Sequence, residues 1–372
     1  MSTSMFLSGL SAVAVAGLFL SGVVMAEDPQ AGPVLSVKDD RFLLDGKETG
    51  LWGIRVASGT HTQQQCDHLI AQLDAYKAHG VNALTVFYMG CRGANYDPFA
   101  PDGKGLDPGH QERMERIIRA CAERNMIVVV GIFYQAAPIR LQDADAVRSA
   151  MRLVTEKLKP YRNVIINVCN EQNSGGWQKF AKVFDFRDTE KIVELCRLVH
   201  EVDPRRIVGG GGYDQDKNIV LGKARDVDVL LFDTAGFEPH LGKLYQRFIE
   251  AGVKGKPIVN VETFGGVTAK YPRGIFSDEL KKHYFCEVDD AAATPGLSVF
   301  FHNNPWCQSQ DQPMRYDLGG QGTEGAPGIR WYFEYVRKKL GIEKAAPAAT
   351  ATDSPAGAPA TPIHGSPPPT EK

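Results

Sequence analysis

The stretch Lys256-Pro257-Ile258-Val259-Asn260-Val261-Glu262-Thr263-Phe264-Gly265 decides the fold of this chain. It holds a short, largely apolar run, which is typical of a strand buried on both faces of a parallel sheet. A carboxylate, Glu262, follows this run directly. Val164–Cys169 has the same character and is followed by Asn170 and Glu171. Both segments therefore predict buried strands that deliver a carboxylate to the same edge of one sheet.

Similar apolar runs recur along the chain, and each is followed by a helical pattern or by a segment long enough for a helix. We expect strands at Leu51–Val56, Ala83–Phe87, Ile127–Phe133, Val164–Cys169, Arg206–Gly209, Val227–Phe232, Pro257–Glu262 and Leu297–His302. We expect helices at Gln63–His79, Gln111–Arg124, Ala144–Leu158, Thr189–Val202, Lys243–Ala251, Asp278–Val288 and Gly328–Leu340, with a weaker pattern at Asp214–Arg225.

This alternation of strands and helices predicts an α/β fold with a parallel sheet and right-handed crossovers. Eight units over about 290 residues favour a closed (β/α)8 TIM barrel. The first strand is followed by Ala57-Ser58-Gly59-Thr60, which is not a phosphate-binding loop. A doubly wound nucleotide-binding sheet is therefore not expected.

The segment before the barrel has turn residues between short apolar runs. Val34–Val37 and Arg41–Leu44, with Asp45-Gly46 as turn residues, predict a short N-terminal β-hairpin. Residues 343–372 are rich in Pro, Ala and Thr and have little apolar bulk, so we expect a disordered tail. We therefore expect residues 27–342 to form the barrel domain.

Residues 1–26 have the features of a signal peptide. Met5 to Ala26 carries no charged residue and ends in compact side chains, although no Lys or Arg precedes it. The stretch is also long enough to span a bilayer, so an uncleaved anchor is the alternative. We expect a secreted or periplasmic protein that is not held at a membrane once the signal is cleaved.

Composition limits the possible partners and cofactors. The chain has 42 basic and 44 acidic residues and no basic run, which argues against nucleic-acid binding. No spacing of a zinc site or of a disulfide-exchange motif occurs among Cys66, Cys91, Cys121, Cys169, Cys196, Cys286 and Cys307. We expect mostly buried free thiols with room for one bridge, no cofactor, and no indication of the oligomeric state.

The active site of such a barrel lies at the carboxyl ends of its strands. Glu171 and Glu262 occupy those ends on strands 4 and 7, which face each other across the barrel mouth. One glutamate at such a place is more often a rim carboxylate in an ion pair. Two on facing strands favour a pair that flanks a scissile bond.

The chain resembles glycoside hydrolase clan A, the barrel superfamily that contains the family 5 cellulases and mannanases. The resemblance rests on Asn170-Glu171 and on the segment from Lys256 to Gly265. It also includes Arg41–Lys47 followed by Leu51–Ile54, and spans nearly all of the chain from residue 34 to residue 342.

The resemblance implies retaining hydrolysis of a β-linked oligo- or polysaccharide. It implies that Glu171 is the general acid/base, that Glu262 is the nucleophile, and that Asn170 bonds the sugar 2-hydroxyl. Strict alternation along a strand would place Asn170 and Glu171 on opposite faces, so we expect a bend at the strand end.

Two positions depart from the clan pattern. The arginine usual near the end of strand 2 is replaced by Thr85, and the Tyr or His usual at the end of strand 6 is missing from Leu230–Thr234. Arg55 on strand 1 is the candidate for the missing charge. Tyr213 and His240 are the candidates for the missing strand 6 group.

Aromatic side chains after the strands are candidates for stacking on sugar rings, by the same face contacts that they make elsewhere. Tyr88, Tyr134, Trp177 and Trp306 lie in such loops, and the glycines and asparagines beside the two tryptophans favour these first. His302, at the end of strand 8, is a further candidate for substrate binding.

Two other functions remain open from the sequence. Hard oxygen ligands and one imidazole could surround a divalent cation in a sugar isomerase or hydrolase, with Glu171, Asp233, Glu262 and His302 as ligands. Alternatively, the altered strands 2 and 6 could belong to a barrel that binds glycan without turnover, since fold does not imply function.

Overall fold

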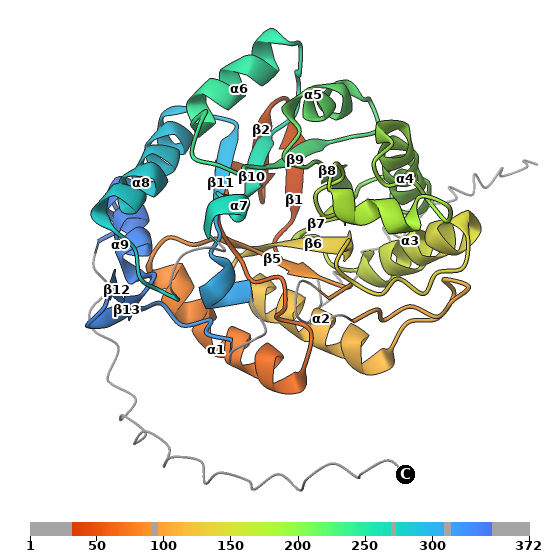
Figure 1. Cartoon of the computed structure of the whole chain (residues 1–372), viewed down its shortest axis with the longest axis horizontal. Coiled ribbons are helices and arrows are strands. Elements are labelled where there is room, and N and C mark those ends of the chain that lie inside the picture. The colour runs from red at the N-terminus through yellow and green to blue at the C-terminus, as the bar shows by residue number, and fades with distance from the viewer. Residues whose placement is uncertain (1–31, 91–95, 269–272, 309–313, 344–372) are drawn as a thin grey trace, which may run out of the picture.

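Eight parallel strands close into a barrel in the computed structural model, which describes residues 32–90, 96–268, 273–308 and 314–343 (Figure 1). The strands are β4 (Trp52–Arg55), β5 (Ala83–Phe87), β6 (Ile127–Phe133), β7 (Val164–Cys169), β8 (Ile207–Gly210), β9 (Val229–Asp233), β10 (Ile258–Glu262) and β11 (Leu297–Phe301). Each pairs with the next along the chain, and β11 pairs with β4 to close the sheet. The predicted TIM barrel is confirmed.

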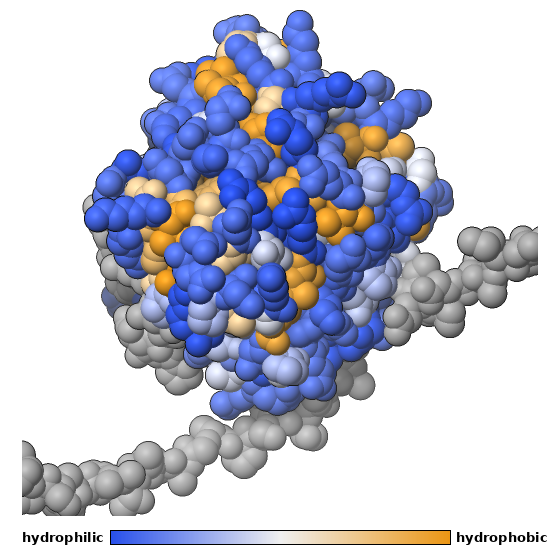
Figure 2. Space-filling model, turned by 90° about the vertical axis from the view of Figure 1, so that its right-hand side faces the viewer, coloured by the Kyte–Doolittle hydropathy of each residue, from blue (hydrophilic) through white to orange (hydrophobic). Residues whose placement is uncertain are grey.

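Helices surround the barrel as an outer layer (Figure 1). They are α1 (Gln63–Ala78), α2 (Pro108–Ala122), α3 (Ala144–Leu158), α4 (Thr189–Val202), α5 (Gln215–Lys223), α6 (Leu241–Glu250), α8 (Asp278–Ala293) and α9 (Arg330–Lys339). Their apolar sides face the strands, and the surface seen in Figure 2 is mainly hydrophilic, with hydrophobic residues interspersed. The weakest prediction, α5, is confirmed. Its N-terminus is capped by Asp214, which accepts from the backbone N–H groups of Asp216 and Lys217.

The N-terminal segment forms three strands where the sequence predicted two. β1 (Leu35–Lys38), β2 (Arg41–Leu44) and β3 (Lys47–Thr49) form an antiparallel meander. The predicted hairpin is confirmed as β1 and β2, and it is extended by a third strand because Asp45-Gly46 turns the chain from β2 into β3. Both turn residues have positive φ, 50° and 77°, as a two-residue hairpin turn requires.

The meander covers the amino-terminal end of the barrel. Leu35 of β1 and Phe42 of β2 belong to one buried cluster with Ile127 and Ile165 at the starts of β6 and β7. The opposite end of the barrel is therefore the one left for a site.

Short elements in the loops escaped the sequence analysis. Helical turns at η1 (Gly175–Phe180), α7 (Gly265–Thr268) and η2 (Asn304–Gln308) follow β7, β10 and β11. A hairpin, β12 (Gly319–Thr323) with β13 (Ala326–Gly328), precedes α9. Its strands are rich in glycine and lack an apolar alternation, so no strand pattern was visible.

Three predictions fall partly or wholly outside the described residues. The signal peptide at residues 1–26 and the tail beyond residue 343 lie there, as does Cys91. The other six cysteines are free, and five of them are buried. Within the described ranges, no helix is long and apolar enough to cross a membrane.

Candidate active site

A pocket of about 510 Å³ opens at the carboxyl ends of the barrel strands. It is lined by Tyr134, Gln135, Ala136, Glu171, Ser174, Gly176, Glu262, Gly265, Gly266, Asn304 and Gln308. These residues follow β6, β7 and β11 or lie at and after the end of β10. The two glutamates singled out from the sequence therefore line one pocket.

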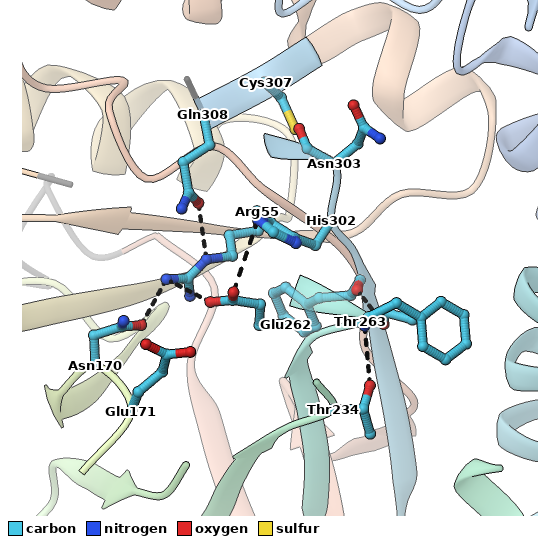
Figure 3. Close-up of polar contacts among 12 residues, drawn as sticks. Arg55, Asn170, Glu171, Thr234, Glu262, Thr263, His302, Asn303, Cys307 and Gln308 are labelled. Carbon is cyan, nitrogen blue, oxygen red and sulfur yellow. Dashed lines mark hydrogen bonds and ion pairs between the residues drawn. The ribbon is translucent and has the colours of Figure 1, made fainter. Parts of the chain in front are cut away.

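Glu262 is the last residue of β10 and is held from its backbone outward. Its carbonyl oxygen accepts from the N–H of Thr234 at 3.0 Å, and its own N–H donates to Oδ1 of Asn260 at 3.3 Å. The carboxylate Oε2 lies 3.0 Å from Nη2 of Arg55 (Figure 3). Gly265 makes room for this side chain, because a Cβ there would lie 2.2 Å from Oε1 of Glu262.

Arg55 is the cation at the centre of the site. Its side chain is fully buried at the end of β4, where it is paired in register with Thr85 of β5. Its Nη2 donates to Oδ1 of Asn170 at 2.6 Å, and its Nε donates to Oε1 of Gln308 at 3.0 Å. Strand 1 therefore places a cation beside Glu262, and Arg55 remains the candidate for the charge that strand 2 lacks.

Burial by itself would lower the pKa of Arg55. The charge of Glu262, followed by weaker effects of Tyr134 and Asp233, outweighs burial and raises that pKa above its ordinary value. Arg55 thus stays cationic at every pH at which the protein is folded. A buried arginine with three bonded neighbours is a rigid fork that fixes the position of each.

Glu171 lies two residues beyond the end of β7 in a bent backbone. Its φ of 42° is in the left-handed region, which costs a residue with a Cβ about 1–2 kcal/mol. The bend lets both Asn170 and Glu171 point toward Arg55 and Glu262 (Figure 3), as expected. Nδ2 of Asn170 donates to Oε1 of Gln135 at 3.0 Å, and Nε2 of Gln135 donates to Oε2 of Glu171.

Glu171 holds a proton near neutral pH. Burial, and after it the negative charge of Glu262, raises the pKa of Glu171 to about 8, while Arg55 and Gln135 act in the opposite direction. The site therefore contains one protonated carboxyl group beside one carboxylate that is paired with a cation. The two groups are set for acid and nucleophilic or basic roles respectively.

The prediction that Trp177 stacks on a sugar ring is wrong. Its side chain is fully buried, so it offers no face to a sugar. Its Nε1 donates to the carbonyl oxygens of both Asn170 and Glu171 at 3.0 Å, and its ring lies 4.2 Å from that of Phe186. The two glycines before it suggested an exposed loop, but η1 turns the indole under the bend that it stabilises.

The predictions that Trp306 and His240 bind substrate are also wrong. Trp306 is 1% exposed, donates from Nε1 to the carbonyl oxygen of Asp317, and lies under the guanidinium of Arg315. His240 lies at the start of α6, on the outside of the barrel, with Nδ1 at 3.0 Å from Oε1 of Glu287 of α8. Neither residue lines the pocket.

Three other predicted residues lie at the site. Tyr134 lines the pocket, and its hydroxyl accepts from Nε2 of Gln308 at 3.1 Å. Tyr213 is 37% exposed, and its pKa is raised by burial and then by the charge of Glu171. His302 is fully buried with Nε2 at 3.9 Å from Glu262, and burial lowers its pKa to about 4, which leaves it neutral.

Two glutamines were missed by the sequence analysis. Gln135 directly follows Tyr134 at the end of a predicted strand, so its position was a usable signal. Gln308 lies in the loop after β11, where no pattern marked it. These amides connect Arg55, Asn170 and Glu171 into one hydrogen-bonded group.

The described ranges contain no set of ligands for the divalent cation that the sequence left open. No three His, Cys, Asp or Glu side chains there are grouped as ligands of one ion. The positive charge next to Glu262 is the guanidinium of Arg55. Glu171, Asp233, Glu262 and His302 are thus not among any such group in the part of the chain that the structure describes.

Replacing Trp177 by phenylalanine should lower the free energy of unfolding by about 1–3 kcal/mol. The carbonyl oxygens of Asn170 and Glu171 both lose the indole N–H, although that of Glu171 still accepts from the N–H of Ser174. Thermal unfolding measures the effect. Trp306→Phe is the control: it also loses one buried hydrogen bond, but its side chain does not line the pocket. Weakened glycan binding by Trp177→Phe at an unchanged melting temperature would restore the stacking role.

Comparison with known proteins finds similar folds but no similar sequence. No protein-family model matches the chain, and no curated protein matches it. Among solved structures, a candidate glycoside hydrolase from Bacteroides vulgatus has a TM-score of 0.59 at 14% identity, over 87% of this chain and 64% of that one. The chain thus spans less than two thirds of that protein.

Two further structures match most of their own length. A glycoside hydrolase family 5 mannosidase from Rhizomucor miehei has a TM-score of 0.54 at 12% identity, over 83% of this chain and 97% of that one. An endo-1,4-beta-mannanase from Eisenia fetida has a TM-score of 0.54 at 15% identity, over 82% and 95%. This chain has the barrel fold of these hydrolases. At such identity the likeness is one of fold, and the site must carry the functional argument.

Proposed function

We propose that this chain is a retaining glycosidase, a divergent member of clan A, that hydrolyses O-glycosidic bonds of a β-linked oligo- or polysaccharide. One observation carries the proposal: two buried glutamates in different environments line the same pocket. Glu262 is paired with Arg55, while burial and the charge of Glu262 raise the pKa of Glu171 to about 8. Both an acid and a nucleophile are required for double displacement, and these two environments supply them. The shared barrel fold supports the assignment.

In the proposed reaction Glu171 protonates the leaving oxygen while Glu262 attacks the anomeric carbon and forms a glycosyl-enzyme. Glu171, now ionised, takes a proton from water as that water hydrolyses the intermediate. Arg55 pairs with Glu262 and holds its carboxylate in one orientation. Asn170, held by Arg55 and Gln135, retains an N–H for the sugar 2-hydroxyl.

The stereochemical outcome tests the mechanism. A retaining pair of carboxyl groups is about 5–5.5 Å apart, too close to admit the water that an inverting enzyme needs. NMR of the first-formed sugar should show retained configuration. Two of the similar structures are named a mannosidase and a mannanase, so β-mannans are the first substrates to screen. An inverted product removes Glu262 as nucleophile, and glycan binding without turnover favours the non-catalytic alternative.

Activity should fall as pH rises through about 8, the pKa of Glu171, because the acid must be protonated to assist the leaving group. The pH dependence of kcat/KM measures this basic limb. Glu171→Gln should remove it, with the residual activity confined to substrates whose leaving group needs no proton. A basic limb that persists unchanged in this variant assigns the acid elsewhere.

The same proton has a stability consequence that needs no substrate. Between the ordinary glutamate pKa and about 8, the folded protein binds a proton that the unfolded chain has lost. The free energy of unfolding therefore decreases as pH rises through this range. Glu171→Gln should lessen that decrease, which thermal unfolding at pH 5 and pH 8.5 measures.

We also propose that residues 1–26 direct export to the periplasm or the exterior. The charge-free run that ends in compact residues supports this. Mass spectrometry of the mature protein tests it, with Glu27 expected as the first residue. An intact N-terminus in the membrane fraction identifies an anchor.

A further inference from the structure

A third carboxyl group, Asp233, stands beside Glu262. Asp233 is the last residue of β9, and it is paired in register with Glu262 at the end of β10. The N–H of Thr234, the next residue, donates to the carbonyl oxygen of Glu262 at 3.0 Å. The register of β9 and β10 shifts by a β-bulge between Asn260 and Glu262, which brings Glu262 level with Asp233. The charge of Glu262 acts on the Asp233 side chain, so the two carboxyl groups lie near each other. Asp233 is 3% exposed, so it shares the buried environment of Glu262.

The charges around Asp233 do not balance if all three carboxyl groups are ionised. Among the described residues, Arg55 is the one buried cation that acts on Glu171, Asp233 and Glu262, and His302 is neutral because burial lowers its pKa to about 4. An unpaired buried charge costs several kcal/mol, and such groups become neutral instead. With Glu171 and Asp233 both protonated, the only charges left are those of the Arg55–Glu262 ion pair.

The groups that face Asp233 agree with a neutral side chain. Burial raises the pKa of Asp233 well above its ordinary value, and the charges of Glu262 and Glu171 raise it further, against a smaller effect of Arg55. Two further titratable neighbours in the described part of the chain, Cys169 of β7 and Tyr213, cannot carry a positive charge, and burial raises the pKa of each.

Hydrogen bonding points the same way. Within the described ranges, Oδ1 of Asp233 and Oε2 of Glu262 are buried without a hydrogen-bond partner, although the latter lies in the ion pair with Arg55. Two carboxylates can only accept, so neither can satisfy the other. One proton on Asp233 turns an unfavourable pair into a donor and an acceptor.

We propose that Asp233 is a neutral carboxylic acid in the resting protein and that its O–H donates a hydrogen bond to Glu262. Asp233 is then a positioning residue, which holds the Glu262 carboxylate in one orientation while Arg55 balances its charge. The positioning role rests on the proposed function, since it needs Glu262 as nucleophile. The protonation of Asp233 does not.

Infrared spectroscopy tests the protonation without any substrate. In protein labelled with carbon-13 at the aspartate carboxyl groups, wild type at pH 7 should show the carbonyl band of a protonated carboxyl. Asp233→Asn should lose this band. Asp216→Asn should keep it, because Asp216 is an exposed aspartate on α5 that pairs with Arg247. Absence of the band from wild type overturns the proposal, whether or not the protein is a glycosidase.

Kinetics test the positioning role. Asp233→Ala should lower kcat about 30-fold with KM within about twofold, and Asp233→Asn only about threefold, because an amide still donates. The basic limb of activity should stay in place in Asp233→Asn, since no charge is removed. If the basic limb of Asp233→Asn lies at a pH lower than that of wild type by one unit or more, Asp233 is ionised in wild type and the proposal is overturned. Wild type without any turnover contradicts the proposed function alone.

Discussion

Glu262→Ala should lower kcat by at least about 10,000-fold, which is a loss of more than about 5 kcal/mol of transition-state stabilisation. Neither Glu171, which holds a proton, nor Arg55, which is a cation, can replace it as nucleophile. The variant should fold, since alanine leaves space in a site that is already open to a pocket. Initial rates on an aryl glycoside measure the loss.

Azide should restore turnover of Glu262→Ala, because a small anion fits the vacated space and attacks the anomeric carbon directly. The product should be the glycosyl azide of inverted configuration. Glu171→Ala should behave differently: it should spare substrates with good leaving groups, and azide should there give retained product. Glu238→Ala is the matched control, since Glu238 is an exposed glutamate in the loop after β9 that pairs with His240. A retained azide product from Glu262→Ala would place the nucleophile elsewhere.

Arg55→Met should be the most destabilising single change at the site, costing about 3–5 kcal/mol of the free energy of unfolding. Glu262 would keep a buried charge without its cation, and Asn170 and Gln308 would each lose a charged donor. kcat/KM should fall about 100- to 1,000-fold, because Glu262 loses the cation that orients it. Denaturant unfolding and initial rates measure the two effects.

A double-mutant cycle separates the charge from the packing. Arg55→Met combined with Glu262→Gln removes both charges, so it should be more stable than Arg55→Met alone. Arg55→Lys keeps the charge but lacks the planar fork that reaches Asn170 and Gln308, and should fall between wild type and Arg55→Met. A loss of less than about 1 kcal/mol in the free energy of unfolding of Arg55→Met would mean that water solvates the Glu262 carboxylate once its cation is gone, as it does for exposed ion pairs.

Local patterns in the sequence were sufficient for the architecture. Each barrel strand is a short apolar run and each helix has its own period, and both signals come from residues that are neighbours in the chain. The end of a strand is likewise a local feature, which is why Glu171 and Glu262 could be chosen as the carboxylates of one pocket. Even the bend at Glu171 followed from strand alternation, which would otherwise direct Asn170 away from the site.

Only the tertiary structure decided what surrounds these carboxylates. Trp177 lies in a glycine-flanked loop, yet it is buried beneath the bend, and nothing in its neighbours along the chain distinguishes the two arrangements. Asp233 ended a predicted strand, but its place next to Glu262 depends on the register of β9 with β10. Arg55 and Gln308 are 253 residues apart in the sequence and 3.0 Å apart in space. The spacing of apolar residues along a strand or helix predicts which of its faces is buried. Which side chains that face contacts depends on how elements distant in the chain pack together, and no local sequence pattern encodes this.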